Sequence, residues 1–216
     1  MIYSNIRRGT FLLRPNRFIA HVEIDGKVEI CHVKNTGRCR ELLIPGASVL
    51  VQECPSPSRK TKFDLICVYK GERLINMDSQ APNRVVGEWL CAGALFPDIV
   101  LCKSEYTWGN SRFDYYVETP SKRVLLEVKG VTLEENGVAL FPDAPTQRGV
   151  RHLLELTRAV EQGYEAWALF VVQMEHIRYF TPNRATHPQF ADALVCSQRQ
   201  GVHLLALECM VTPTQL

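Results

Sequence analysis

One short apolar run that ends in charged residues most constrains the fold of this chain: Arg123-Val124-Leu125-Leu126-Glu127-Val128-Lys129. Its apolar, β-branched character is typical of a strand covered on both faces, so it predicts a sheet between two packed layers. Successive side chains of a strand point to opposite faces, and Glu127 and Lys129 therefore share one face. Buried charges are costly unless they are paired or bind a metal. The run thus predicts either a structural ion pair or a metal site.

A second acid lies on the neighbouring predicted strand. Ser111–Glu118 has strand character and Thr119-Pro120-Ser121-Lys122 is a turn signal, so the two runs form a hairpin in which Asp114 faces Glu127. Two carboxylates and a lysine on neighbouring strands fit a Mg²⁺-dependent site that cuts phosphodiester bonds. The triplet alone carries little information, because acid-x-Lys also occurs at Asp25-Gly26-Lys27, a predicted hairpin turn.

The composition is that of an ordinary globular protein. Of 216 residues, 46% are hydrophobic and 22% are charged, and the length suits one large or two small domains. No stretch approaches the roughly eighteen apolar residues of a membrane span. The chain starts without an apolar signal core, and none of its eight cysteines forms a Cys-x-x-Cys pair. We therefore expect a cytoplasmic protein with reduced thiols, and neither a zinc site nor a disulfide framework.

Charge is divided unevenly along the chain. Residues 1–83 hold 13 Lys and Arg against 8 Asp and Glu, a net charge of +5, and residues 84–216 hold 12 against 15, a net charge of −3. The two values add up to the overall +2. A basic half favours contact with a polyanion, although a solvated surface also produces such a difference.

The first eighty residues consist of short predicted strands with almost no helix. The strands are Thr10–Leu13, Phe18–Ile24, Val28–Val33, Ser48–Glu53, Phe63–Tyr69 and Arg73–Ile75, and the one predicted helix is Arg38–Leu43. This pattern predicts a small closed barrel of the OB type over residues 1–81, with other small barrels as alternatives.

The pattern changes near residue 82 and predicts a mixed α/β domain over residues 82–216. Predicted helices are Arg84–Leu95, Gln147–Gln162 with a Thr146 cap, and Gln189–Arg199, and further strands are Ile99–Tyr106, Ala166–Gln173 and Val202–Val211. On the long helix, the spacing of Val150, Leu153, Leu154, Thr157 and Val160 predicts the apolar face.

This order of elements is similar to the core of the PD-(D/E)xK nuclease superfamily, in which the second strand brings an aspartate and the third brings the (D/E)-x-K triplet. The chain as a whole resembles the SfsA family, the sugar fermentation stimulation proteins. The motifs that carry the resemblance are His32–Leu42, Ser111–Asp114, Glu127–Leu133, Phe141–Ala144 and Thr146–Gly149 with His152-Leu153. The superfamily's proline before the aspartate is Phe113 here, and Gly130 follows the lysine.

The resemblance implies an N-terminal OB domain, a nuclease-like C-terminal domain, DNA binding without marked sequence preference and a regulatory link to sugar metabolism. On nuclease-like geometry, Asp114, Glu127 and the Val128 carbonyl would bind Mg²⁺ or Mn²⁺, and Lys129 would orient or deprotonate the attacking water. Glu88 on the preceding helix is a further candidate metal ligand, with a solvated helix face as the alternative.

Candidate nucleic-acid contacts lie in both halves. In the basic half they are Arg14, Arg17, Arg38 and Arg40, with Phe11 and Phe18 either stacking on bases or forming barrel core. The loop Asn35-Thr36-Gly37-Arg38 is either a phosphate contact or a structural turn. In the other half the candidates are Arg148, Arg151 and His152 on the polar side of the long helix, and Asp143 in the preceding loop. Three functions remain open: a DNA nuclease, a non-enzymatic DNA-binding regulator and an RNA-directed enzyme. Nothing in the sequence specifies an oligomeric state.

Overall fold

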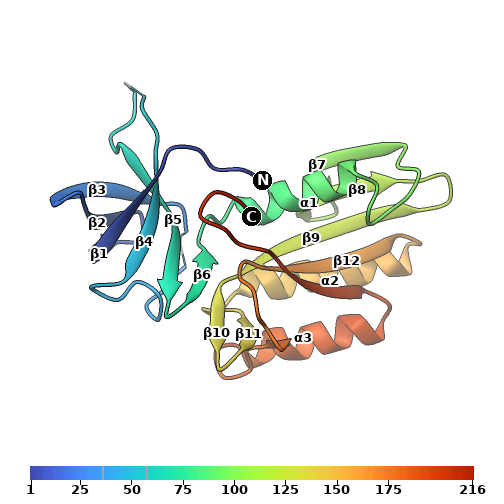
Figure 1. Cartoon of the computed structure of the whole chain (residues 1–216). Helices are drawn as coiled ribbons and strands as arrows, with labels where there is room; N and C mark the ends of the chain where they lie inside the picture. The colour runs from blue at the N-terminus through green and yellow to red at the C-terminus, as the bar shows by residue number, and fades with distance from the viewer. Residues whose placement is uncertain (36, 57) are drawn as a thin grey trace.

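The first sheet of the computed structural model is a closed barrel; the structure describes residues 1–35, 37–56 and 58–216. Its strands are β1 (Ile6–Asn16), β2 (Ile19–Ile24), β3 (Lys27–Val33), β4 (Ser48–Glu53), β5 (Phe63–Lys70) and β6 (Arg73–Asn76). They follow the order β3-β2-β1-β4-β5-β6, and a parallel pairing of β3 with β5 closes the first five into a barrel that β6 extends (Figure 1). Closure removes the free edges of the sheet, which would otherwise expose unpaired backbone groups.

Local sequence explains most of the barrel. Along β2, Ala20, Val22 and Ile24 are buried and alternate with more exposed residues, as period-two patterning requires. Asp25 and Gly26 both have positive φ, 50° and 73°, which is the geometry of the predicted two-residue hairpin. The predicted helix Arg38–Leu43 is wrong, since this segment forms only a turn in which the N–H groups of Leu42 and Leu43 donate to the Cys39 carbonyl. Cys39 has a φ of 45°, which a right-handed helix does not allow.

The second part of the chain is a sheet between helical layers. The strands β7 (Leu101–Trp108), β8 (Ser111–Glu118), β9 (Arg123–Val131), β12 (Glu165–Val172) and β14 (His203–Glu208) follow the order β14-β12-β9-β8-β7. One face is covered by α1 (Ala81–Cys91), and the other by α2 (Gln147–Glu161) and α3 (Pro188–Arg199) (Figure 1). The central position of β9 and its burial confirm the expectation of a strand covered on both faces.

A small third sheet was missed by the sequence patterns. It contains β10 (Leu133–Glu135), β11 (Val138–Phe141) and β13 (Tyr179–Pro182), with β11 in the middle. The turn between β10 and β11 is Asn136-Gly137, and both residues have positive φ. Asn-Gly is a strong hairpin signal, but these strands are too short to show a clear alternation.

The helix α2 begins as predicted, since the Thr146 side chain accepts a hydrogen bond from the Gly149 N–H. Its apolar face is rotated from the predicted one. Leu154 is 51% exposed, whereas His152 and Glu155 are buried. Each bonds to a charged side chain, His152 to Glu127 and Glu155 to Arg158. These bonds offset the cost of burying a polar group, which a prediction from hydrophobic periodicity does not take into account.

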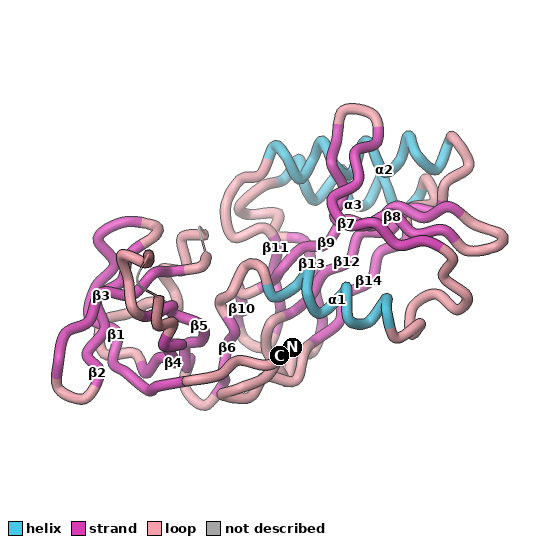
Figure 2. Tube along the Cα trace, turned by 90° about the horizontal axis from the view of Figure 1, so that it is seen from above, coloured by secondary structure: helices cyan, strands magenta, loops and turns pink. Residues whose placement is uncertain are grey.

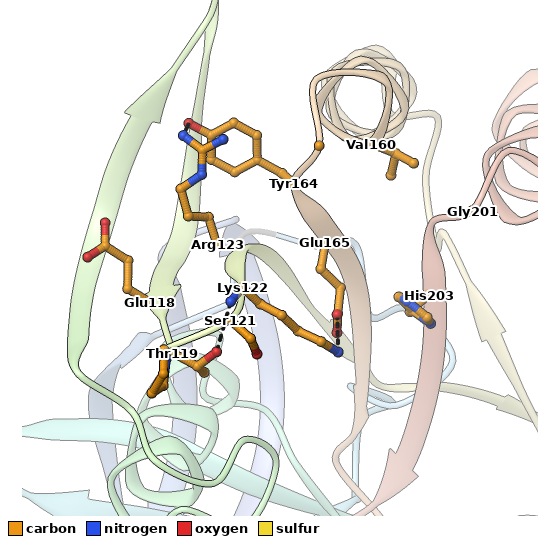
Figure 3. A pocket seen from close by; sticks show the side chains of 12 residues that line it. Glu118, Thr119, Ser121, Lys122, Arg123, Val160, Tyr164, Glu165, Gly201 and His203 are labelled. Atoms are coloured by element: carbon orange, nitrogen blue, oxygen red, sulfur yellow. Dashed lines mark hydrogen bonds and ion pairs between the residues drawn. The ribbon is translucent and has the colours of Figure 1, made fainter.

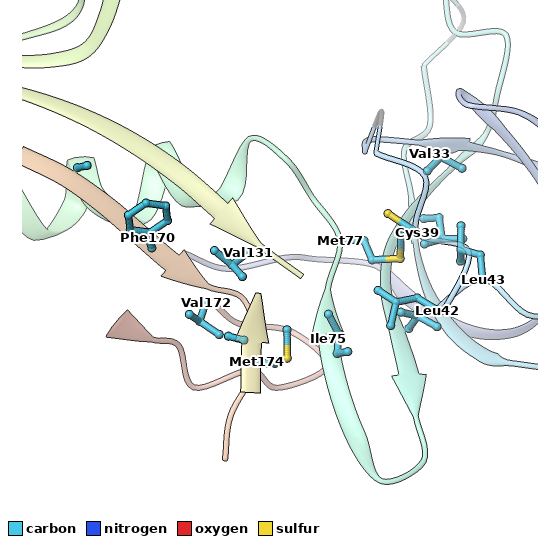
Figure 4. Close-up of a cluster of buried hydrophobic side chains, with 14 of the residues drawn as sticks. Val33, Cys39, Leu42, Leu43, Ile75, Met77, Val131, Phe170, Val172 and Met174 are labelled. Atoms are coloured by element: carbon cyan, nitrogen blue, oxygen red, sulfur yellow. The ribbon is translucent and has the colours of Figure 1, made fainter. Parts of the chain in front are cut away.

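Barrel and sheet share one apolar core. Ile75 and Met77, at the end of the barrel, belong to the same buried cluster as Val131, Val172 and Met174 (Figure 4). The change from barrel to helix falls between Asn76 and Ala81, and the two ends of the chain lie side by side between the two lobes (Figure 2). No helix in the described ranges is long and apolar enough to cross a membrane.

Candidate functional site

The two predicted acids meet where β8 and β9 separate. Their backbone pairing runs from Glu118↔Arg123 to Tyr115↔Leu126. Beyond that point the Val128 N–H donates to the Asp114 carboxylate, Oδ2, at 2.7 Å. On the other side of β8, the pairing with β7 continues in the same register but is interrupted at Glu105 and Asp114, and Glu105 has a φ of 54°.

A residue of α1 fixes the other oxygen of Asp114. The Asn83 side-chain amide donates to Oδ1 at 2.7 Å, and the Tyr115 hydroxyl donates to the backbone carbonyl of Asn83 at 2.6 Å. Sequence reasoning missed Asn83. The one available signal was that Asn83 lies in the first turn of α1. The sequence pattern predicted that this helix begins at Arg84, so Asn83 fell outside it.

Glu127 uses only one of its carboxylate oxygens. Oε1 accepts from the Lys129 ammonium group and lies 2.5 Å from the His152 ring nitrogen Nδ1. Oε2 is buried and has no hydrogen-bond partner within the described ranges. A buried charged oxygen without a partner costs free energy, on the order of 1–3 kcal/mol or more. A carboxylate oxygen without a partner is expected of a metal ligand, whereas an ion pair alone gives no reason to bury it.

The two carboxylates have opposite electrostatic environments. Burial and the neighbouring charge of Glu127 raise the pKa of Asp114, although Val128 and Asn83 act in the other direction. Burial alone would also raise the pKa of Glu127, but His152 and Lys129 bring it below its ordinary value. A cation between the two acids would favour the charged form of both and would relieve their repulsion.

His152 has a different place from the one predicted. Its side chain is 3% exposed, and it bonds to Glu127 inside the protein instead of facing a nucleic acid. Arg148, one turn earlier on α2, donates from Nε to His152 Nε2 at 3.3 Å. Arg148 and Arg151 are both exposed. We call Asp114, Glu127 and Lys129 the acid cluster. The structure adds His152 to this cluster and leaves the exposed Arg148 at its rim.

Two other predicted residues lie apart from the acids. Glu88 is on α1, but its carboxylate is 62% exposed and accepts from the Met1 amino group at 2.9 Å. The structure therefore favours the solvated helix face. Asp143 lies against the barrel, because a methyl group on Gly37 would meet its Oδ2 at 2.6 Å. Asp143 and Gly37 line a cavity of about 360 Å³ that also reaches Gly130, the residue after Lys129.

The predicted arginines of the barrel share one groove. Arg14, Arg17, Arg38 and Arg40 line a recess of about 540 Å³. Arg14 nevertheless has a structural role that corrects its predicted one, since its guanidinium donates to the carbonyls of Arg17, Asn35, Gly37 and Arg38 at 2.6–2.9 Å. The other three are exposed. Thr36, in the predicted phosphate loop, lies outside the described residues.

The two predicted aromatics differ. Phe11 is 1% exposed and belongs to the barrel core, which was one of its two predicted roles. Phe18 is 45% exposed, and the Arg17 guanidinium lies 4.9 Å from the centre of its ring. Of the two, only Phe18 is available for stacking on a base.

Two family models match the chain in the same order as its two structural parts. The model of the SfsA N-terminal OB domain matches residues 12–77, and the model of the sugar fermentation stimulation protein RE domain matches residues 80–215. The chain belongs to the SfsA family. A sugar fermentation stimulation protein homolog from Desulfitobacterium hafniense is 63% identical over 212 residues, which cover 98% of this chain and 92% of the relative. One from Ruminiclostridium cellulolyticum is 60% identical over 211 residues, covering 98% and 93%.

A solved structure of an SfsA protein has the same fold. The Pyrococcus furiosus SfsA, in complex with Ca²⁺, matches with a TM-score of 0.84 and 26% identity, covering 100% of this chain and 94% of that one. The similarity to SfsA proteins confirms the predicted fold class, a mixed α/β protein with an N-terminal OB-like barrel followed by an α/β domain.

The donor set of the SfsA acid cluster suits a hard cation. Asp114 and Glu127 offer carboxylate oxygens, and no group of three or more His, Cys, Asp or Glu side chains in the described part of the chain is arranged to hold a metal. Mg²⁺ accepts one or two carboxylates because it retains several waters, whereas zinc needs three or four protein ligands. The residues present therefore fit Mg²⁺ or Mn²⁺ and do not fit zinc.

A further recess lies at the end of β9 that is opposite to the acids. It has a volume of about 780 Å³ and surrounds the turn between β8 and β9 (Figure 3). Two of its cationic side chains have partners in the lining: Lys122 pairs with Glu165 at 2.5 Å, and the Arg123 guanidinium lies 4.3 Å from the Tyr164 ring centre. None of the predicted site residues lines it.

Proposed function

We propose that this SfsA-family protein binds DNA with little sequence preference and hydrolyses phosphodiester bonds with the help of Mg²⁺ or Mn²⁺. The observation that carries the proposal is the buried, unpartnered Oε2 of Glu127 in the same cluster as Asp114. The Ca²⁺ complex of the Pyrococcus furiosus relative supports a divalent cation in this fold.

Each residue of the cluster has a distinct role in this proposal. Asp114 and Glu127 hold the cation, with the Val128 carbonyl as a further oxygen ligand. A bound Mg²⁺ or Mn²⁺ would acidify a water and neutralise charge on the scissile phosphate. Lys129, as an ammonium group, would orient that water, and its positive charge would stabilise the developing negative charge. The water oxygen would bond to phosphorus as one P–O ester bond breaks; the water would lose a proton to solvent, and the leaving oxygen would gain one from solvent.

The barrel groove supports the binding half of the proposal. Arg17, Arg38 and Arg40 are exposed around one recess, and guanidinium groups suit contacts with phosphate oxygens. Such contacts read no base sequence, and they weaken as salt rises. RNA offers the same phosphates and stays an alternative polymer.

A second candidate function is binding without cleavage. The groove is lined by barrel residues between 11 and 45, whereas Asp114, Glu127 and Lys129 lie on β8 and β9, so the groove offers phosphate contacts of its own. In this form the protein would be a DNA-binding regulator, and the name of its relatives favours a link to sugar fermentation.

A cleavage assay separates the two functions. Single- and double-stranded DNA and RNA are incubated with Mg²⁺ or Mn²⁺ and with wild-type protein, Asp114→Asn or Lys129→Ala. We expect cleavage by the wild type and a loss of at least about 100-fold in each variant, because each removes a group that stabilises the transition state. A parallel gel-shift measurement at low and high salt reports binding independently.

The matched control is Glu161→Gln, which removes an exposed acid at the end of α2. It should cleave at the wild-type rate. Absence of cleavage by the wild type on every substrate would refute the nuclease proposal and leave the binding function. Equal cleavage by the wild type and both variants would identify a contaminating nuclease. Failure to shift any nucleic acid at low salt would refute the binding function.

A further inference from the structure

His152 is a buried histidine whose two ring nitrogens both contact charged side chains. The residue is 2% exposed, and its ring packs edge-on against Phe113, with 5.8 Å between ring centres. Nδ1 lies 2.5 Å from Glu127 Oε1, and Nε2 lies 3.3 Å from Arg148 Nε. The ring therefore stands between an exposed arginine at the start of α2 and the acid cluster.

The contact with Arg148 determines which ring nitrogen carries the proton. The Nε–H of arginine can only donate, so His152 Nε2 must accept. In a neutral imidazole the other nitrogen then carries the hydrogen, and Nδ1–H donates to Glu127 Oε1. With the hydrogen on Nε2 instead, the Nδ1 lone pair would face a carboxylate oxygen and repel it.

This bond decides which oxygen of Glu127 is available. Oε1 receives two donors, His152 and Lys129, while the buried Oε2 receives none in the described part of the chain. Lys129 alone is a weak constraint, because an ammonium group on four methylenes rotates freely and is 20% exposed here. The rigid, buried imidazole instead fixes the plane of the carboxylate.

We propose that His152 is a positioning residue: it holds Glu127 through Oε1 so that Oε2 is presented to a divalent cation beside Asp114. This inference rests on the metal-dependent function proposed above. Arg148 supports the arrangement by selecting the Nδ1–H form of the ring. Histidine and carboxylate partners behind metal ligands commonly act in this way, by fixing the orientation of the ligand.

The test measures cation affinity without any cleavage. Ca²⁺ is titrated calorimetrically into the full chain as wild type, His152→Ala, His152→Asn and Arg148→Ala. We expect His152→Ala to weaken Ca²⁺ binding about 10- to 100-fold, the usual effect of removing such a partner. His152→Asn should restore most of the affinity, because its amide nitrogen takes the place of Nδ1–H. Arg148→Ala should give a smaller loss, about three- to tenfold.

A spectroscopic measurement checks the ring itself. Nitrogen-15 spectra of the wild type should show His152 with a protonated Nδ1 and an unprotonated Nε2. In Arg148→Ala, the two resonances should move toward an average of both forms. The control is Arg158→Ala, on the same helix, whose exposed guanidinium pairs with Glu155. It should leave both the Ca²⁺ affinity and the His152 resonances unchanged.

Three results would overturn the inference. The first is wild-type Ca²⁺ affinity in His152→Ala, and the second is His152→Asn binding as weakly as His152→Ala in a protein with wild-type thermal unfolding. The third is a wild-type ring in which Nδ1 carries no hydrogen. Should His152→Ala fail to fold, Arg148→Ala and the nitrogen spectra still decide. A wild type that binds neither Ca²⁺, Mg²⁺ nor Mn²⁺ would instead refute the proposed metal-dependent function, and this inference with it.

Discussion

At the residue scale, Asp114 carries a free-energy cost that function explains. Its carboxylate is enclosed between β8 and β9, and burial together with Glu127 raises its pKa. In a folded protein whose carboxyl pKa is raised, the charged form is disfavoured, so stability falls as the pH rises through that pKa. Without a cation, the protein therefore carries this penalty at neutral pH. The substitution Asp114→Asn removes the charge while keeping the shape.

We expect Asp114→Asn to unfold at a higher temperature than the wild type in the presence of a chelator. The gain should be about 1 kcal/mol, or about 2–4 °C for a chain of this size. The Asn83 amide can turn to present its oxygen to the new side chain. Scanning calorimetry with chelator, and again with Ca²⁺, measures the effect: Ca²⁺ should stabilise the wild type and leave the variant unchanged.

The control for this measurement is Asp192→Asn, which removes an exposed acid paired with Arg184 on the surface. Its unfolding temperature should stay within about 1 °C of the wild type, because exposed pairs contribute little. A destabilised Asp114→Asn in chelator would contradict the assignment of strain to Asp114.

At the scale of elements, two hairpins are joined by one acid. Glu134 on β10 is buried, and it pairs with Lys70 of β5 at 2.7 Å and Arg73 of β6 at 2.9 Å. The Gly137 N–H, in the turn before β11, also donates to it. Burial alone would raise the pKa of Glu134, but the bonds from Lys70, Gly137 and Arg73 lower it from 4.5 to about 2. The β5–β6 hairpin of the barrel is thereby fixed to the β10–β11 hairpin.

The pH dependence of this contact follows from the lowered pKa. A carboxyl with a lowered folded-state pKa stabilises the protein above its unfolded pKa, and the contribution is lost as pH falls through the folded pKa. Glu134→Gln should therefore cost about 1–3 kcal/mol at pH 7, after allowance for the partial exposure of Lys70, and the difference should shrink between pH 4.5 and about 2. Urea unfolding at several pH values measures it.

The neighbouring acid supplies the control. Glu135 is on the same strand and is exposed, so Glu135→Gln should change stability by less than about 0.5 kcal/mol at every pH. A Glu134→Gln variant with a pH-independent loss would show that packing, and not the ionised carboxylate, dominates the contact.

At the scale of the whole molecule, a buried polar bridge connects the barrel to the second sheet. Gln173, 1% exposed, donates to the Asn76 carbonyl at 3.1 Å, the Asn76 side-chain oxygen at 2.8 Å and the Asp78 carbonyl at 3.1 Å. The backbone carbonyl of Gln173 accepts from the backbone N–H of Asn76 at 2.9 Å. From this bridge and the shared apolar core we expect the two parts of the chain to unfold as one cooperative unit.

We expect the wild type to unfold in a single calorimetric transition. Gln173→Ala should lower stability by about 2–4 kcal/mol, because it leaves buried acceptors without donors, and it should separate the transition into two. Gln198→Ala, at an exposed glutamine of α3, is the matched control and should behave as the wild type. Two transitions already present in the wild type would contradict the single cooperative unit.

Local patterns were sufficient to predict the elements that carry the acids. The apolar run predicted β9, the turn at residues 119–122 predicted its hairpin with β8, and the Thr146 cap fixed the start of α2. These predictions succeed because alternation, turn residues and caps act over a few neighbouring residues. The same local signals predicted that Asp114 and Glu127 would come close.

Only the tertiary structure decided which atoms those acids use. Asn83 reaches Asp114 across 31 residues of sequence, and His152 reaches Glu127 across 25. Hydrophobic periodicity placed His152 on a polar helix face, because it cannot anticipate that a distant carboxylate will satisfy a buried ring. The closure of the barrel by β3 and β5 is likewise a non-local pairing. Sequence thus determined the elements and the candidate acids, whereas long-range packing determined their hydrogen-bond partners and left Glu127 Oε2 without one in the described part of the chain.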